Sequence, residues 1–168
     1  MKQIHAVAGS LHGYDACFFC LGASSSGLSE ARYTEVTYDL TMLIASVFLE
    51  VNPDLTFIFI SGAGTDSSEK GRIMWARVKG RTENALLKLP FKAAYMLRPG
   101  VIQPLHGIKS KTWQYQILYT LMTPALPLLK KLMPGLVTTT EQIGRAMIRL
   151  AMNEKTKSVL ETRDINLI

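Results

Sequence analysis

Three glycine-containing turns and one lysine carry the residue types that could do chemistry in this sequence. The turns are residues 20–22 ("CLG"), 61–64 ("SGAG") and 98–100 ("RPG"), and each follows an apolar segment. Glycine lets a ligand approach the backbone closely, and ligands bind at the carboxyl ends of the strands in open parallel sheets. This order of segments predicts a small-molecule site at one edge of a sheet.

Trp75 and Lys79 add a charge and a hydrogen-bond donor to that edge. They lie four residues apart in "GRIMWARVKGRTE", which is one helical turn. A lysine ammonium stabilises negative charge on a neighbouring oxygen. An indole N–H donates a hydrogen bond but does not release its proton near neutral pH. The alternative interpretation is a half-buried aromatic ring beside a solvated lysine, with Glu83 forming a surface ion pair with Lys79.

These residues must be positioned by alternating strands and helices. We expect apolar strands at residues 16–21, 55–64 and 93–102, and a short terminal strand within 158–167. We expect helices at residues 29–52, 68–89 and 138–153. Ser29 is the expected N-cap of the first helix, and Thr138 with Glu141 has capping-box spacing at the last. Asp66 and Glu69 fit the first turn of the second helix, where negative charge is favoured.

This alternation predicts an α/β fold. Continuously apolar strands imply a parallel sheet with helices on both faces, and right-handed crossovers make that sheet Rossmann-like. We expect one domain over residues 1–168 that corresponds to the C-terminal portion of the Rossmann fold. We expect residues 111–137 to form a proline-divided helical flap on it.

Composition limits the function classes. The chain has 168 residues and a net charge of +6, spread without a block of like charges. This favours a solvated surface with some preference for anionic ligands, and no nucleic-acid-binding module is visible, so we expect no nucleic-acid partner. Cys17 and Cys20 are interpreted as structural, because side chains three apart on a strand point to opposite faces. We expect a reducing, cytoplasmic setting.

A membrane contact is a further alternative. The apolar run 117–129 is shorter than the roughly 20 residues that a spanning helix needs, and Pro124 and Pro127 interrupt it. Aromatic and basic residues flank the run, which is compatible with peripheral contact with a membrane surface. A flap packed on the domain explains the same pattern.

Four stretches together resemble a known enzyme family. They are "YDACFFCLGASSSG", "FIFISGAG", "MWARVKGRTENAL" and "YMLRPGVIQP". The chain resembles the extended and atypical short-chain dehydrogenase/reductases, in particular the small NAD(P)-binding branch similar to the Tat-interacting-protein oxidoreductases and epimerase-like bacterial proteins. The resemblance covers residues 14–153.

This resemblance implies roles for the matching residues and NAD or NADP as the cofactor. The cofactor-binding residues that it implies are Cys20, Leu21 and Gly22 on the adenosine and ribose side, Ser61 and Lys79 at the nicotinamide ribose and substrate oxygen, and Pro99 and Gly100 beside the nicotinamide. The catalytic positions that it implies are Ser61, Lys79 and Trp75. Trp75 stands where the family has its proton-donating tyrosine.

A second departure from the family concerns the phosphates. No glycine-rich phosphate-binding turn precedes "YDACFFCLG", although family members begin with one. We therefore expect an oxidoreductase-like or epimerase-like protein with impaired or absent activity on a small-molecule substrate that the sequence does not identify. The alternative is a non-catalytic protein of this fold that binds a partner or a membrane surface.

The missing first half also predicts self-association. The strand at residues 16–22 would be an apolar edge that carries no charge to protect it. We expect a homo-oligomer, formed by pairing of this edge near residues 17–20 or by packing of helices that include residues 42–48. Phe19→Lys should weaken the first interface and Phe48→Lys the second.

Overall fold

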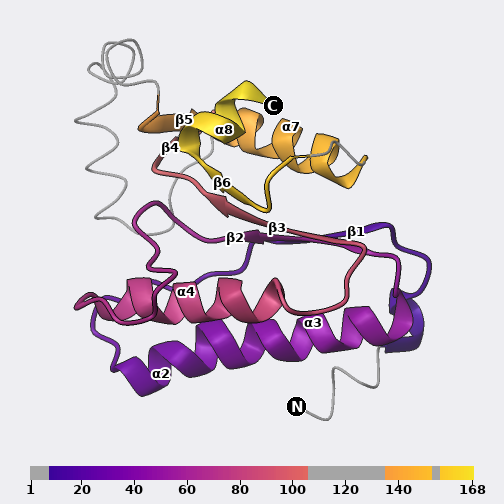
Figure 1. Ribbon diagram of the computed structural model, residues 1–168, viewed down its shortest axis with the longest axis horizontal. Coiled ribbons are helices and arrows are strands. Elements are labelled where there is room, and N and C mark those ends of the chain that lie inside the picture. The colour runs from indigo at the N-terminus through magenta and orange to yellow at the C-terminus, as the bar shows by residue number, and fades with distance from the viewer. Residues whose placement is uncertain (1–7, 106–134, 153–155) are drawn as a thin grey trace.

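A computed structural model describes residues 8–105, 135–152 and 156–168 of the chain. Its centre is a parallel sheet in the order β1-β2-β3-β6 (Figure 1). The strands are β1 (Ala16–Phe19), β2 (Thr56–Ile60), β3 (Ala93–Arg98) and β6 (Val159–Glu161). Two short strands, β4 (Val101–Gln103) and β5 (Val137–Thr139), pair in parallel beside it. The predicted α/β fold with a Rossmann-like parallel sheet is confirmed.

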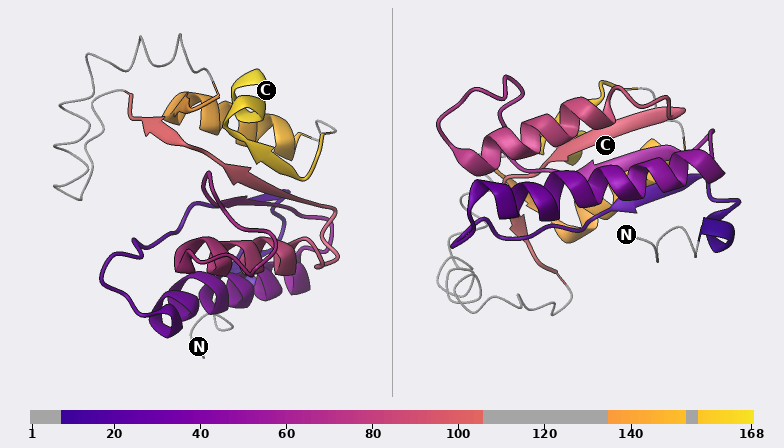
Figure 2. Two further views of the ribbon diagram at one scale, coloured as in Figure 1. Left: turned by 60° about the vertical axis from the view of Figure 1, so that its left-hand side comes forward. Right: turned by 90° about the horizontal axis from the view of Figure 1, so that it is seen from below.

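Helices cover both faces of the sheet (Figure 2). On one face, α2 (Glu30–Thr34), the π-helical turn η2 (Glu35–Asp39) and α3 (Leu40–Val51) run on as one long helix beside α4 (Met74–Leu86). The other face carries α7 (Thr140–Ala151) and α8 (Thr162–Leu167). A short 3₁₀ turn, η1 (Ala8–Leu11), precedes β1.

The ends of the first long helix follow the sequence signals. The Ser29 hydroxyl accepts a hydrogen bond from the Arg32 backbone N–H, so the expected N-cap is confirmed. At the other end, the buried Asn52 side chain accepts from Gly13 N–H at 2.8 Å and donates to the Leu11 carbonyl at 2.6 Å. Asn52 thereby fixes the chain that leads into β1.

Two apolar cores lie on the two faces of the sheet. The core under α3 and α4 contains Phe19, Phe57, Phe59, Leu86 and Met96, with Cys17, Met42, Ile44 and Phe48 packed against it. The core under α7 and α8 contains Ile58, Leu97, Met147, Leu150 and Leu160. β2 and β3 contribute alternate residues to both cores, which is why they read as continuous apolar runs.

β1 departs from the buried strand that its sequence suggests. It ends at Phe19, two residues early, and Phe18 is 43% exposed while Phe19 is only 5% exposed. Phe19 is not the residue with which to test pairing of this edge, because its side chain belongs to the core. Phe48 also packs against that core, so α3 is not left with an uncovered apolar side at this residue.

Three boundaries differ from the sequence-based expectation. The second helix begins at Met74, so Asp66 and Glu69 lie in the preceding loop, where the Asp66 carboxylate accepts from Ser68 and Gly71. The N-cap of α7 is Thr139 and not Thr138, because it is the Thr139 hydroxyl that accepts from the Gln142 N–H. The terminal segment is the short strand β6 followed by α8. Residues 111–134 of the expected flap lie outside the described residues.

Candidate ligand site at the carboxyl edge of the sheet

The turns after β2 and β3 are joined by backbone hydrogen bonds. The Ser61 N–H donates to the Leu97 carbonyl at 2.8 Å, and the Ala63 N–H donates to the Pro99 carbonyl at 2.9 Å. Residues 20–22 follow β1, the neighbouring strand, and are exposed, with 60% of Leu21 open to solvent. The three predicted turns therefore lie at one edge of the sheet.

Lys79 reaches this edge from α4. Its Nζ donates to the Ser61 carbonyl at 2.6 Å and lies 3.8 Å from the position that a Cβ on Gly62 would take. Burial lowers the pKa of the Lys79 ammonium, and the negative charge of Glu83 raises it in part. Lys79 is thus half-buried and bonded to the loop, not a solvated lysine. One hydrogen bond leaves the ammonium further N–H donors for a ligand.

The Ser61 hydroxyl is already committed as a donor. It is 2.9 Å from Thr65 Oγ1, which in turn donates its proton to the Gly62 carbonyl at 2.8 Å. A threonine hydroxyl has one proton, so Ser61 must be the donor in its bond with Thr65. Ser61 is also 6% exposed. In this arrangement it can accept a hydrogen bond from a ligand but cannot donate one to a substrate oxygen.

Trp75 lies in the first turn of α4 and packs on the glycine turn. Its Cη2 atom is 3.5 Å from the position that a Cβ on Gly64 would take, and Gly64 has a φ of +86°. The left-handed backbone explains the glycine, because the distance to the ring is an ordinary van der Waals contact. The ring is half-buried, one helical turn from Lys79, as the spacing predicts.

Glu83 and Arg98 form a buried ion pair that the sequence did not predict. Glu83 is 1% exposed, and the Arg98 Nε donates to its Oε1 at 3.0 Å and Oε2 at 3.1 Å. The expected surface pair of Glu83 with Lys79 is therefore wrong. The hydrogen bond to Glu83, together with the charges of Glu83 and Glu161, raises the pKa of Arg98 above its ordinary value.

Arg98 also binds two further groups near the site. It donates to the Glu161 carboxylate at 3.2 Å and to the Ser67 hydroxyl at 2.5 Å. The "RPG" turn is thereby tied to α4, β6 and the loop after β2. The spacing of residues along α4 could have predicted that Glu83 is buried. Glu83 is three residues before Leu86 and seven after Ala76, which places all three on the buried side of the helix.

The loop between β2 and α4 lies directly on the helix at Gly80. A Cβ on Gly80 would be 1.8 Å from the Asp66 carbonyl oxygen, and the Asp66 N–H donates to the Ala76 carbonyl at 3.1 Å. This contact holds residues 61–66 against the first turns of α4. It sets the distance between Lys79 and Ser61.

Two surface hollows lie away from these residues. One of about 200 Å³ is lined by the α2, α4 and loop residues Glu30, Thr34, Glu69, Arg77, Val78 and Arg81. Another of about 320 Å³ is lined by Asp15, Phe18, Lys92, Ile148, Ala151 and Met152. Within the described ranges, no group of three histidine, cysteine or acidic side chains is placed to hold a metal ion.

In comparisons with known proteins, no family model matches the chain, and no curated protein matches it significantly. Among the helices that the structure describes, none has both the length and the apolar character needed to cross a membrane.

Proposed function

We propose that this chain is a protein of the short-chain dehydrogenase/reductase type that binds the ribose and nicotinamide side of NAD or NADP weakly and does not reduce a carbonyl. A reducing, cytoplasmic setting is part of this proposal. The observation that carries it is the position of Lys79, whose Nζ is 2.6 Å from the Ser61 carbonyl at the carboxyl edge of β2.

Lys79 suits a contact with ribose hydroxyls. Its ammonium is held half-buried between α4 and the glycine turn, and it keeps donors beyond the one given to Ser61. Residues 20–22 and 63–64 are exposed and allow a flat ligand to approach the backbone, whereas Arg98 and Pro99 are buried. These features fit one ribose and the ring attached to it.

The same residues do not fit carbonyl reduction. A reductase needs a proton donor and a hydrogen bond to the developing oxyanion. Trp75 cannot release its indole proton, and the Ser61 proton is donated to Thr65. We therefore derive no hydride transfer at this site.

The start of the first helix also does not fit a pyrophosphate. Its N-terminal N–H groups, which bind phosphate in dinucleotide-binding folds, are capped by Ser29, and Glu30 adds a negative charge there. The Glu30 carboxylate would repel a phosphate, and the Arg32 N–H already donates to Ser29. We therefore expect NAD or NADP to bind weakly, because its pyrophosphate gains no contacts at this helix.

A titration of the full chain with NADH and NADPH, followed by amide NMR shifts, tests the proposal. We expect a dissociation constant of about 1 mM, equivalent to about 4 kcal/mol of binding free energy. Shifts should concentrate at residues 61–64, 79 and 98–100. Lys79→Met should weaken binding by about fivefold to tenfold, the value of one hydrogen bond.

Lys88→Met is the matched control, because Lys88 is an exposed lysine just after α4. It should leave binding unchanged. Low-micromolar binding, or shifts that avoid the Lys79 region, would contradict the proposal.

A further inference from the structure

Among the residues that the structure describes, no strand pairs with the outer edge of β1. β1 is the first strand of the sheet and pairs with β2 on one side. The Thr56 N–H donates to the Asp15 carbonyl, and Ala16 is the register partner of Thr56. In a parallel ladder alternate residues bond to the same neighbour, so Cys17 bonds inward. The N–H and C=O groups of Ala16 and Phe18 therefore point away from the sheet.

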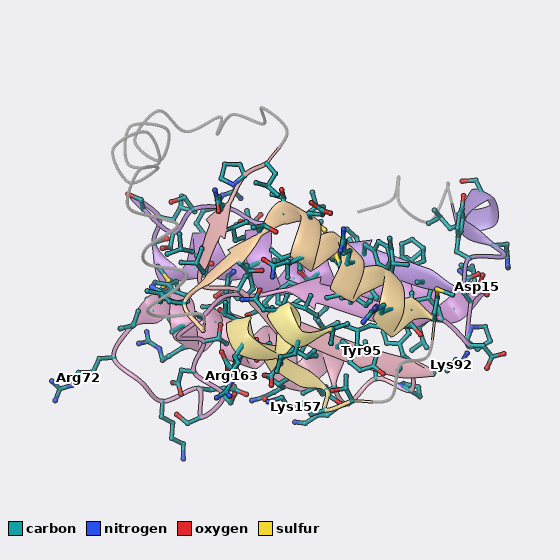
Figure 3. All side chains as sticks on the ribbon, turned by 90° about the horizontal axis from the view of Figure 1, so that it is seen from above. Asp15, Arg72, Lys92, Tyr95, Lys157 and Arg163 are labelled. Atoms are coloured by element: carbon teal, nitrogen blue, oxygen red, sulfur yellow. The ribbon has the colours of Figure 1, made fainter. Side chains whose placement is uncertain are left out.

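A surface hollow beside Phe18 of β1 lies on the α7 face and has both apolar and charged residues in its lining. Phe18 is 43% exposed, and the α7 residues Ile148 and Met152 are 54% and 76% exposed. These three side chains line the hollow of about 320 Å³ together with Asp15, Lys92 and Ala151. Figure 3 looks onto this face and shows Asp15 and Lys92 beyond the C-terminal end of α7. Large apolar side chains gathered on one surface indicate an interaction site.

We propose that a second copy of this chain pairs with the β1 edge in antiparallel orientation, so that the two sheets become one across a two-fold axis. When two antiparallel strands pair, a residue whose N–H and C=O groups point toward the other strand must lie opposite a residue of the same kind, and the two form a hydrogen-bonded pair. This condition is met when Ala16 of each copy lies opposite Phe18 of the other. Cys17 then lies opposite Cys17 of the second copy.

This register is self-complementary in shape and charge. On the α7 face, the large Phe18 ring lies across from the small Ala16 side chain, so both copies fill the space beside the other's edge. Ala16–Phe19 contains no charged residue or proline that would oppose pairing. The Asp15 carboxylates fall at opposite ends of the paired strands, about 14 Å apart at the rise of an antiparallel strand.

Pairing through α3, the other route to an oligomer, has less support. Met42, Ile44 and Phe48 already pack against the protein's own core. Among the described residues, the β1 edge is the predicted interface with an exposed aromatic side chain, Phe18, and outward-pointing backbone groups. The inference does not depend on nucleotide binding, since Lys79 and the glycine turns take no part in it.

The first test is the mass of the full chain in solution. Sedimentation velocity from about 1 to 100 μM, a range that covers modest interfaces, should show a dimer. Phe18→Lys should raise the dimer dissociation constant at least tenfold, as expected for a buried aromatic at the centre of an interface. Leu167→Lys is the control, because Leu167 is 77% exposed on α8 and away from the edge. Circular dichroism should show that both variants stay folded.

The second test needs no change at the edge. In Cys20→Ser, mild oxidation should join two Cys17 side chains across the axis, since Cα atoms of a non-hydrogen-bonded pair lie about 4.5 Å apart, within disulfide range. The oxidant takes up the two electrons and two protons that the thiols lose. Cys17→Ser should remove the cross-link. A monomer across the concentration range, a dimer unaffected by Phe18→Lys, or a dimer without the Cys17 cross-link would overturn the proposal.

Discussion

Arg98 at the end of β3 binds the carboxylate of Glu83 on α4 in a pair that is almost sealed from solvent, with Glu83 at 1% and Arg98 at 9% exposure. Lys79 is one helical turn before Glu83 on the same helix. The pair therefore fixes how α4 is placed against the sheet, and with it the position of Lys79 against the Ser61 carbonyl. The buried ion pair thus helps to hold Lys79 in place at the candidate site.

Removing one partner of this pair should be costly. Glu83→Gln leaves the buried Arg98 with only the half-exposed carboxylate of Glu161, and we expect a loss of about 3 kcal/mol in the free energy of unfolding. Urea denaturation measures it. The double variant Glu83→Leu with Arg98→Met should recover most of the loss, because the desolvation cost of both charges disappears. Glu35→Gln, at an exposed ion pair on the long helix, should change stability by less than about 1 kcal/mol. A single variant as stable as the control would show that the pair is not a buried constraint.

Gly80 should not tolerate a methyl group, although it lies in a helix. A Cβ there would meet the Asp66 carbonyl at 1.8 Å, so Gly80→Ala must push the loop away from α4, at a cost of about 2–4 kcal/mol. Gly144→Ala in α7 is the matched control, since nothing lies within 4 Å of its Cβ position. That change should stabilise the protein by up to about 1 kcal/mol. Thermal unfolding of the two variants gives the comparison, and equal effects would contradict the loop contact.

Cys17 should make stability fall at alkaline pH. Burial, with a smaller contribution from Cys20, raises the pKa of the Cys17 thiol from 9.0 to about 11. The folded state therefore holds this proton more tightly than the unfolded state. Its contribution is fully present below pH 9 and is lost as the pH rises through about 11. After a discount for partial exposure, we expect about 1–2 kcal/mol.

The measurement is the difference in unfolding free energy between the wild type and Cys17→Ala at pH 8 and at pH 11. Because the other titrating groups are common to both proteins, the difference isolates Cys17. A difference that stays constant with pH would show that the thiol is not held in its neutral form.

Restoring a tyrosine at position 75 should not create a reductase. Trp75→Tyr places a phenol one turn before Lys79, and general acid catalysis contributes about 10²–10⁴-fold only when the reactants are positioned. The Ser61 proton would still be donated to Thr65. We expect no turnover above the wild type when NADPH oxidation is followed with a panel of carbonyl compounds. Robust turnover would mean that the cofactor and the substrate oxygen are held after all.

The sequence by itself determined the main strands and helices and their order, because the signals are local, but it did not indicate β5 or α8. Apolar runs bounded by glycine and proline predicted β2 and β3, and the Ser29 cap predicted the start of the long helix. The spacing of Trp75 and Lys79 needed only the helical repeat. The alternation of strands and helices was enough to bring the glycine turns to one edge, since parallel strands end on the same side.

The tertiary structure decided what each polar group does. The burial of Glu83 depends on the rotation of α4 about its axis and on Arg98 of a later strand, which no local pattern links. The commitment of Ser61 to Thr65 depends on the path of a loop. The exposure of Phe18, against the burial of Phe19, depends on where β1 stands in the sheet. Hydrophobic periodicity shows which residues can be buried, but only the packing of distant segments decides which faces and hydrogen-bonding groups are left free.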